Sequence, residues 1–300
     1  MTPDAIGRAA AAALYDELAL SPKPGLVTFT SNGSHSDMDA RTFMRSLSSL
    51  RPYFVRIAGL GATGAEFPEL ERAGIEAEAR MLAATGGVNT HRGAIFLLGL
   101  LCASAGAVVA TRRQLTPEVL RTMLIERWGD ALQRRSSRPS HLPGGIAARQ
   151  LKLRSASEEA ALGFPAVFET AIPAMCSALR RGLSRERAQL DTLFHLMATL
   201  DDSNLAHRGG LDGLRFAQRA ARGFIDQGGA ATPDAQDRAA AIAADFEARR
   251  LSPGGSADML AAVCWMRRIG ALDAIDGVDG VDGVDGVGGV GVVPTRLALS

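Results

Sequence analysis

Apolar residues recur at three- and four-residue steps along most of this chain, which is the spacing of amphipathic α-helices. Phe43, Leu47, Leu50 and Phe54 give the clearest example, because together they place one apolar face on a helix over about 39–59. Further helices are expected over roughly 3–20, 66–84, 92–110, 116–135, 159–180, 185–199, 209–226, 233–250 and 256–272. Alternating patterns that predict strands are hard to find before the tail. We therefore expect an all-α protein, a single-domain bundle of about ten helices over residues 1–273.

Two stretches depart from this helical pattern. Residues 134–157 are basic and rich in Ser, Pro and Gly, with no clear period, which is typical of a functional loop or a disordered segment. The tail, residues 274–300, repeats Asp-Gly-Val in tandem and continues as GGVGVV. Such a Gly-rich repeat cannot build a core of its own, so we expect a flexible tail without a catalytic role.

Composition and charge exclude several classes of protein. Apolar residues make up 47% of the chain, and 33 Lys and Arg nearly balance 32 Asp and Glu, so no overall field attracts nucleic acid or an anionic membrane. The apolar stretch 93–110 is rich in Gly, Ala and Ser, and we expect a buried core helix rather than a membrane span. Three well-separated cysteines in apolar runs suggest free thiols in a reducing compartment. With no signal peptide recognisable at the start, we expect a cytoplasmic protein.

Four polar islands interrupt the apolar background, at 21–39, 86–93, 201–210 and 251–258. Each contains residues that could simply cap a helix or form the turn before one. Capping and turns alone do not explain the four islands together. Most of the histidines lie in or beside polar segments, and His-Arg-Gly occurs twice, each time after an Asn. Glycine-flanked helix starts offer free backbone N–H groups and a positive dipole end, which suits phosphate.

The charged residues of these islands point to a magnesium–polyphosphate ligand. Lys23, Arg92 and Arg208 could hold phosphate, since arginine can grip it with two donors. The expected Mg²⁺ ligands are the carboxylates of Asp37, Asp39, Asp201, Asp202 and Asp258. Zinc is disfavoured because no Cys lies near a His. The sequence contains neither GxxxxGK[ST] nor GxSxG, so it has no P-loop and no nucleophile elbow.

The islands resemble, in the same order along the chain, the signatures of the triphosphoribosyl-dephospho-coenzyme A synthase family. The resemblance rests on PKPGLV at 22–27, GSHSDMD at 33–39, GGVNTHRGAIF at 86–96, EAALGFP at 159–165, DDSNLAHRGG at 201–210 and SPGGSADML at 252–260. It implies a helical enzyme that uses ATP and dephospho-CoA and releases adenine. The product would be a prosthetic-group precursor that a further transferase passes to an acyl-carrier subunit. The segment 33–54 is more similar to the malonate decarboxylase branch than to the citrate lyase branch.

The resemblance also implies roles for individual residues. The expected catalytic residues are Asp37, His91, Asp201, Asp202 and His207. Either of the two histidines could protonate departing adenine or orient a phosphate. The expected phosphate-binding residues are Lys23, Asn89, Arg92, Asn204, Arg208, Gly254, Gly255 and Ser256, and His35, Asp39 and Glu159 also match family motifs. One departure is that an arginine expected just before Glu159 is either displaced to Arg154 or missing.

Two other functions account for part of the pattern. A helical Mg²⁺-dependent glycohydrolase would use similar aspartates but transfer the sugar to water, so it would release adenine without an acceptor. A non-catalytic helical module that binds an acyl-carrier protein would explain the bundle but not the aspartates or the paired His-Arg-Gly segments.

Overall fold

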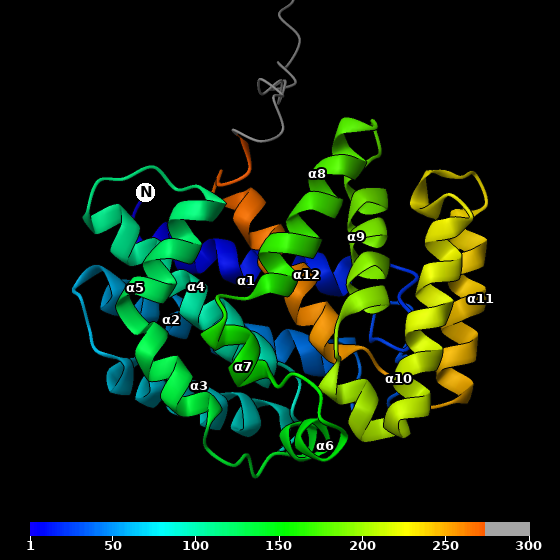
Figure 1. The fold of residues 1–300 in the computed structure, drawn as a ribbon, viewed down its shortest axis with the longest axis horizontal. Helices are drawn as coiled ribbons and strands as arrows, with labels where there is room; N and C mark the ends of the chain where they lie inside the picture. Colours follow the sequence, from blue (N-terminus) through cyan, green and yellow to red (C-terminus); the bar gives the residue numbers. More distant parts are fainter. Residues whose placement is uncertain (274–300) are drawn as a thin grey trace, which may run out of the picture.

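The computed structural model describes residues 1–273, and this part of the chain folds into twelve α-helices without a strand (Figure 1). The helices are α1 (Pro3–Ala19), α2 (Ala40–Ala62), α3 (Phe67–Thr85), α4 (Arg92–Ala110), α5 (Pro117–Ser136), α6 (Pro143–Leu151), α7 (Ala156–Ala161), α8 (Ile172–Arg180), α9 (Arg185–Thr199), α10 (Ser203–Asp226), α11 (Ala235–Ala248) and α12 (Gly254–Arg268). The all-α prediction is confirmed. The tail predicted over 274–300 lies outside the described residues.

Helix α4 is the central helix of the core, and α2, α3, α5 and α12 pack around it. Two glycines allow α2 and α4 to cross at close range. A Cβ atom on Gly61 would overlap the carbonyl oxygen of Ala103, and one on Gly106 would overlap that of Ala58. By length and composition α4 could cross a membrane, but 78% of that stretch is buried inside the protein. The apolar run therefore forms a core helix, as expected from its sequence.

The chain departs from the expected helices in two places. The helix expected over 159–180 is broken, because Gly163 and Phe164 take left-handed backbone conformations and Pro165 cannot donate a backbone hydrogen bond. A π-helix, Ala166–Ala171, and then α8 follow this break. Residues 134–157 were expected to lack regular structure, yet they contain the short helix α6.

Helices α6 and α7 lie at the lower front of Figure 1, with α3 on one side and α10 on the other. Small residues on α6 allow it to pack closely on α10. A Cβ atom on Gly144 would lie 3.0 Å from Ser203 Oγ, and the neighbouring Ala147 and Ala148 are buried. The starts of α6 and α10 therefore meet, and a cavity lies beside this junction.

Candidate active site

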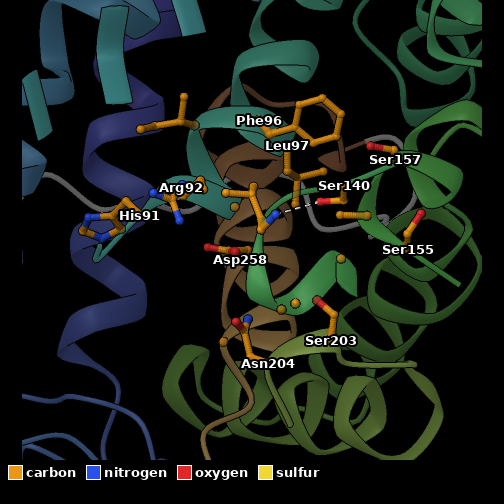
Figure 2. Close-up of a pocket in the computed structure, with 18 of the residues that line it drawn as sticks. His91, Arg92, Phe96, Leu97, Ser140, Ser155, Ser157, Ser203, Asn204 and Asp258 are labelled. Atoms are coloured by element: carbon orange, nitrogen blue, oxygen red, sulfur yellow. Dashed lines mark hydrogen bonds between the residues drawn. The ribbon is translucent and has the colours of Figure 1, made fainter. Parts of the chain in front are cut away.

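A cavity of about 1540 Å³ opens among the first turns of α4, α6, α10 and α12. Sites for single drug-sized ligands usually measure about 300–1,000 Å³, so this cavity has room for two large substrates. Figure 2 shows Arg92 to the left, Phe96 above, Asp258 near the centre, Ser203 below and Ser155 to the right. Residues far apart in sequence therefore line one site.

The structure brings most of the expected site residues to this cavity. Its lining contains His35, Asp37, Asn89, His91, Arg92, Asn204, His207, Arg208, Gly254, Gly255 and Asp258, whereas Lys23, Asp39, Glu159, Asp201, Asp202 and Ser256 do not line it. Of the residues outside the lining, Lys23, Glu159, Asp202 and Ser256 are buried behind the site, whereas Asp39 and Asp201 are half-buried.

The starts of α4, α10 and α12 pack directly on one another. A Cβ atom on Gly93, in the first turn of α4, would overlap the carboxylate of Asp258 in α12. A Cβ atom on Gly254 would lie 2.8 Å from Asn204 Nδ2 in α10. Glycine thus allows three positive helix ends to share one space, an arrangement that attracts a polyanion.

Asp202 joins the starts of α10 and α12. Its Oδ1 accepts hydrogen bonds from the backbone N–H groups of Asn204 (3.0 Å) and Leu205 (3.4 Å). Its Oδ2 accepts from the N–H (2.9 Å) and the hydroxyl (3.1 Å) of Ser256. Burial raises the pKa of Asp202, and these hydrogen bonds oppose that shift. Both oxygens are engaged, so Asp202 acts as a cap for two helices rather than as a group facing the cavity.

Asp258 is the acidic residue at the meeting point of α4 and α12. The backbone N–H of Ala94 donates to its carboxyl group. Burial raises the pKa of Asp258 well above its ordinary value, and the nearby carboxylates of Glu17 and Asp202 raise it further. A cation placed beside Asp258 would relieve this repulsion and favour the ionised form.

Lys23 was expected to hold phosphate, but its ammonium group is fully buried in an ion pair. Nζ lies 2.5 Å from Glu17 Oε1 and donates to the Glu17 carbonyl oxygen at 2.6 Å. Burial lowers the pKa of Lys23, and the attraction of Glu17 opposes the shift. Glu17 itself lines the cavity. Lys23 therefore balances the charge of Glu17 beneath the site.

His91 presents an unpartnered nitrogen at the cavity. The Thr90 hydroxyl donates to Ser46 Oγ at 2.7 Å, so the Ser46 proton is directed to His91 Nδ1, 2.6 Å away. This assigns the ring proton to Nε2, which is buried and has no partner within residues 1–273. Burial and the Lys23 charge lower the pKa of His91 to about 3. The imidazole is neutral at physiological pH and can donate a hydrogen bond from Nε2, but it cannot supply a proton as an imidazolium acid.

Three of the polar islands are tied together at Arg208. Its guanidinium donates to the carbonyl oxygens of Ser34 and Arg250, each at 3.1 Å, and to His35 Nδ1 at 3.0 Å. His35 Nε2 consequently carries the ring proton and donates to Ser252 Oγ at 3.0 Å. Burial, and then the Arg208 charge, lower the pKa of His35. These contacts hold the loop around residue 35 against the start of α12.

Among the other expected residues, some are held by contacts within the protein and others are exposed to the cavity. Arg92 pairs with Glu78 at 2.6 Å, and its backbone N–H donates to the side chain of Asn89. Asn204 and His207 are exposed on the cavity side of α10. His207 is therefore free of the burial that constrains His91.

Two carboxylates that matched family motifs have structural contacts. Asp39 caps α2 by accepting from the backbone N–H (2.8 Å) and hydroxyl (2.7 Å) of Thr42. Glu159 is buried; it accepts the Ala166 N–H at 2.6 Å and pairs with Arg154 at 3.0 Å. The displaced arginine, Arg154, therefore does pair with Glu159. The Arg154 N–H also contacts Asp201 Oδ2 at 3.3 Å, which places Asp201 against this segment.

The five aspartates expected to bind metal are not gathered into one cluster. Among the described residues, no group of three or more His, Cys, Asp or Glu side chains is close enough to hold an ion by itself. Asp39 and Asp202 are occupied as helix caps, whereas Asp37 and Asp258 line the cavity. Mg²⁺ commonly takes one or two carboxylates and completes its shell with water and phosphate oxygens. Asp258, whose charge is disfavoured by its neighbours, fits that requirement best.

Sequence reasoning missed several residues that line the cavity or contact a residue that does. Glu17 lies in a helix without any motif, and Ser46 is one of several polar residues on α2. Arg138, Arg149 and Lys152 belong to the basic segment 134–157, which was recognised only as a possible functional loop. The composition of that segment was the available signal for the last three.

Comparison with known proteins is consistent with this arrangement. Residues 3–276 match the family described as CitG: ATP:dephospho-CoA triphosphoribosyl transferase. The chain is 39% identical to a probable 2-(5''-triphosphoribosyl)-3'-dephosphocoenzyme-A synthase of Vibrio cholerae serotype O1 (strain M66-2), over 88% of this chain and 87% of that protein. It is 36% identical to a protein of the same name from Acinetobacter calcoaceticus, over 86% of this chain and 88% of that protein. No solved structure matches the chain. The chain thus belongs to the ATP:dephospho-CoA triphosphoribosyl transferase family.

Proposed function

We propose that this protein transfers the 5-triphosphoribosyl group of ATP to the ribose 2′-hydroxyl of 3′-dephospho-CoA and releases adenine. The bond between ribose C1′ and the adenine ring nitrogen breaks, and a new bond forms between C1′ and the acceptor oxygen. The hydroxyl proton ends on adenine, so atoms and charge balance. The triphosphate stays intact on the transferred ribose.

The observation that carries this proposal is the convergence of three helix starts on a cavity large enough for two substrates. The first turns of α4, α10 and α12 direct their positive dipole ends to this cavity, which suits a triphosphate. Family membership supplies the substrates, because the matching family is described by ATP and dephospho-CoA. A purely structural helix junction would not need an open space at these ends.

His91 acts in this scheme as a neutral hydrogen-bond donor. The chain from Thr90 through Ser46 fixes the proton on Nε2, which needs an acceptor inside the cavity. A ring nitrogen of adenine is such an acceptor, and charge builds on adenine as its bond to ribose breaks. A fixed donor aimed at developing charge lowers the barrier without transferring its own proton.

His207 and Asp258 take the other two roles. His207 is exposed to the cavity, and histidine is the commonest general base, so it accepts the proton from the attacking hydroxyl and releases it to solvent, from which departing adenine takes up its proton. Asp258 would hold Mg²⁺ together with phosphate oxygens. When bound, the ion would neutralise part of the triphosphate charge.

Adenine release from ATP and Mg²⁺, with and without dephospho-CoA, tests this reaction. We expect adenine only with the acceptor, together with a product heavier than dephospho-CoA by the triphosphoribosyl group. Adenine without acceptor would identify a glycohydrolase, and no adenine from folded protein would contradict any catalytic assignment. An Asp258→Asn variant should require more Mg²⁺ for half-maximal rate, while Asp37→Asn tests the other cavity aspartate in parallel.

We further infer that the product serves the malonate decarboxylase branch in the cytoplasm. The segment GSHSDMDARTFMRSLSSLRPYF at 33–54 supports the branch, and the wide separation and burial of the three cysteines support the compartment. Complementation separates the branches: the gene should restore malonate decarboxylase in a strain lacking its own synthase better than it restores citrate lyase.

A further inference from the structure

One wall of the cavity carries cations that pair with nothing else in the described chain. Arg138, Arg149 and Lys152 line the cavity, yet none of their side chains forms an ion pair or hydrogen bond within residues 1–273. The other cavity arginines differ, because Arg92 and Arg154 pair with Glu78 and Glu159. Unpaired cations on a cavity wall favour an anionic ligand.

Helix α6 and the residues at its two ends combine small buried side chains with long side chains at the cavity. Gly144 lies against Ser203 of α10, where a larger side chain would not fit, and Ala147 and Ala148 are buried. Leu142, just before the helix, and Arg149 and Lys152, at its end, all line the cavity. The cavity side of this segment therefore begins with an exposed leucine and ends with two cations.

The backbone at Lys152 is also unusual. Its φ is 55°, a left-handed conformation that normally favours glycine or asparagine at the end of a helix. Lysine at this position gives up local backbone stability and places a cation at the cavity. Such a compromise is typical of functional positions.

Apolar side chains at the same cavity remain exposed. Leu142 is 44% exposed, Leu162 49% and Ile75 65%, and all three belong to the cavity lining. ATP ends at its phosphates and has no group that would cover apolar side chains lying beyond a cationic strip. Dephospho-CoA continues from its two phosphates into a long pantetheine arm, so its chemistry matches cations followed by an apolar rim.

We propose that the cavity face of α6, with Arg149 and Lys152, binds the pyrophosphate of the acceptor and directs its pantetheine arm along Leu142 and Leu162. This inference rests on the proposed function for the identity of the acceptor. It divides the cavity in two: the triphosphate of ATP lies at the starts of α4, α10 and α12, and the acceptor lies along α6.

The double variant Arg149→Ala/Lys152→Ala tests the division. We expect the KM for dephospho-CoA to rise at least about tenfold, in line with the loss of about 1.4 kcal/mol or more, while the KM for ATP changes less than about twofold. At saturating acceptor, kcat should stay within about twofold. A rise in the KM for ATP instead, or no change in either KM, would overturn the proposal.

A matched control is available at the other end of the molecule. Arg112 and Arg113 are exposed, do not line the cavity, and Arg112 has a φ of 57°, close to that of Lys152. The variant Arg112→Ala/Arg113→Ala removes the same charge from a comparable backbone site and should leave both KM values unchanged. Lys152→Gly should weaken acceptor use without lowering the Tm, since glycine suits the left-handed backbone.

Calorimetric titration of dephospho-CoA into the protein without ATP separates this proposal from the reaction itself. We expect binding that weakens about tenfold or more in the Arg149→Ala/Lys152→Ala variant and competition by 4′-phosphopantetheine. Weaker binding in the variant supports the subsite even if the wild-type protein fails to release adenine, which would refute only the proposed reaction. Equal binding by both proteins, or no binding by the wild type, overturns the subsite.

Discussion

The two walls of the cavity satisfy their charged groups in opposite ways. On the wall built from the starts of α4, α10 and α12, Asp202 and Arg208 have partners contributed by distant segments of the chain. On the α6 wall, Arg149 and Lys152 have none within the described residues. The difference shows that a recognisable motif need not touch a ligand. Much of the motif set holds helix ends in place, and the less distinctive basic segment carries the free charge.

The largest expected effect comes from breaking the buried ion pair beneath the first wall. Lys23→Met leaves Glu17 without its partner and should lower the free energy of unfolding by about 3–5 kcal/mol. The double variant Glu17→Gln/Lys23→Met should recover a large part of this loss. Urea denaturation measures both, with Arg8→Ala, which removes an exposed pair, expected to cost about 0–1 kcal/mol. Equal losses from Lys23→Met and Arg8→Ala would refute the buried pair.

Two adjacent aspartates allow the next comparison. Asp202→Ala removes the cap of two helices and leaves buried donors unpaired, so we expect a loss of about 2–4 kcal/mol in unfolding free energy. Asp201 makes one longer contact, to the Arg154 N–H, and Asp201→Ala should cost less than about 1 kcal/mol. Similar losses in the two variants would contradict the double cap.

His91 tests whether a neutral donor contributes to catalysis. His91→Gln can present an amide N–H near the position of Nε2, whereas His91→Asn places its amide closer to Nδ1. We expect kcat to fall about tenfold further in His91→Asn than in His91→Gln, in keeping with the loss of one hydrogen bond of about 1.4 kcal/mol. Steady-state adenine release gives both values. Equal kcat for the two variants would argue against a role for the Nε2 proton.

Near neutral pH the smallest effect is a pH dependence of stability from the same side chain, and it grows as the pH falls. The pKa of His91 is lowered to about 3 in the folded protein, against about 6.5 in an unfolded chain. Between these values the unfolded state binds more protons, so the free energy of unfolding falls as the pH drops from about 6.5 toward 3. The contribution reaches about 1.4 kcal/mol per pH unit. Denaturation of the wild type and His91→Gln across this range should differ by that slope, and parallel curves would place His91 in a solvated environment.

Sequence periodicity predicted most of the fold because long helices with large apolar residues leave a strong signal. Helix α6 was missed since its buried residues are Ala147 and Ala148, too small to mark a periodic face. The break after α7 depends on the left-handed backbone conformation of Phe164. An apolar aromatic residue gives no sign of such a conformation in the sequence.

The candidate site was only partly predictable, because charge identity does not reveal what a side chain meets. Lys23 has the charge for phosphate, yet Glu17, six residues earlier, buries it in an ion pair. Asp202 has the charge for a metal, yet Ser256, 54 positions later, occupies its second oxygen. In contrast, Asp258 and His91 were expected at the site, and both line the cavity. The partner of each charged side chain could be identified only once the arrangement of the helices was known.

The shared cap at Asp202 has a consequence for anyone who wishes to redesign this enzyme. One carboxylate caps the starts of both α10 and α12. A substitution that moves one of these helix ends will therefore disturb the other. Helix α6 is attached differently, through a small-residue contact with α10 that leaves its opposite face open. Acceptor preference should therefore be exchangeable by replacing residues 142–152 as a cassette, with the nucleotide end left untouched.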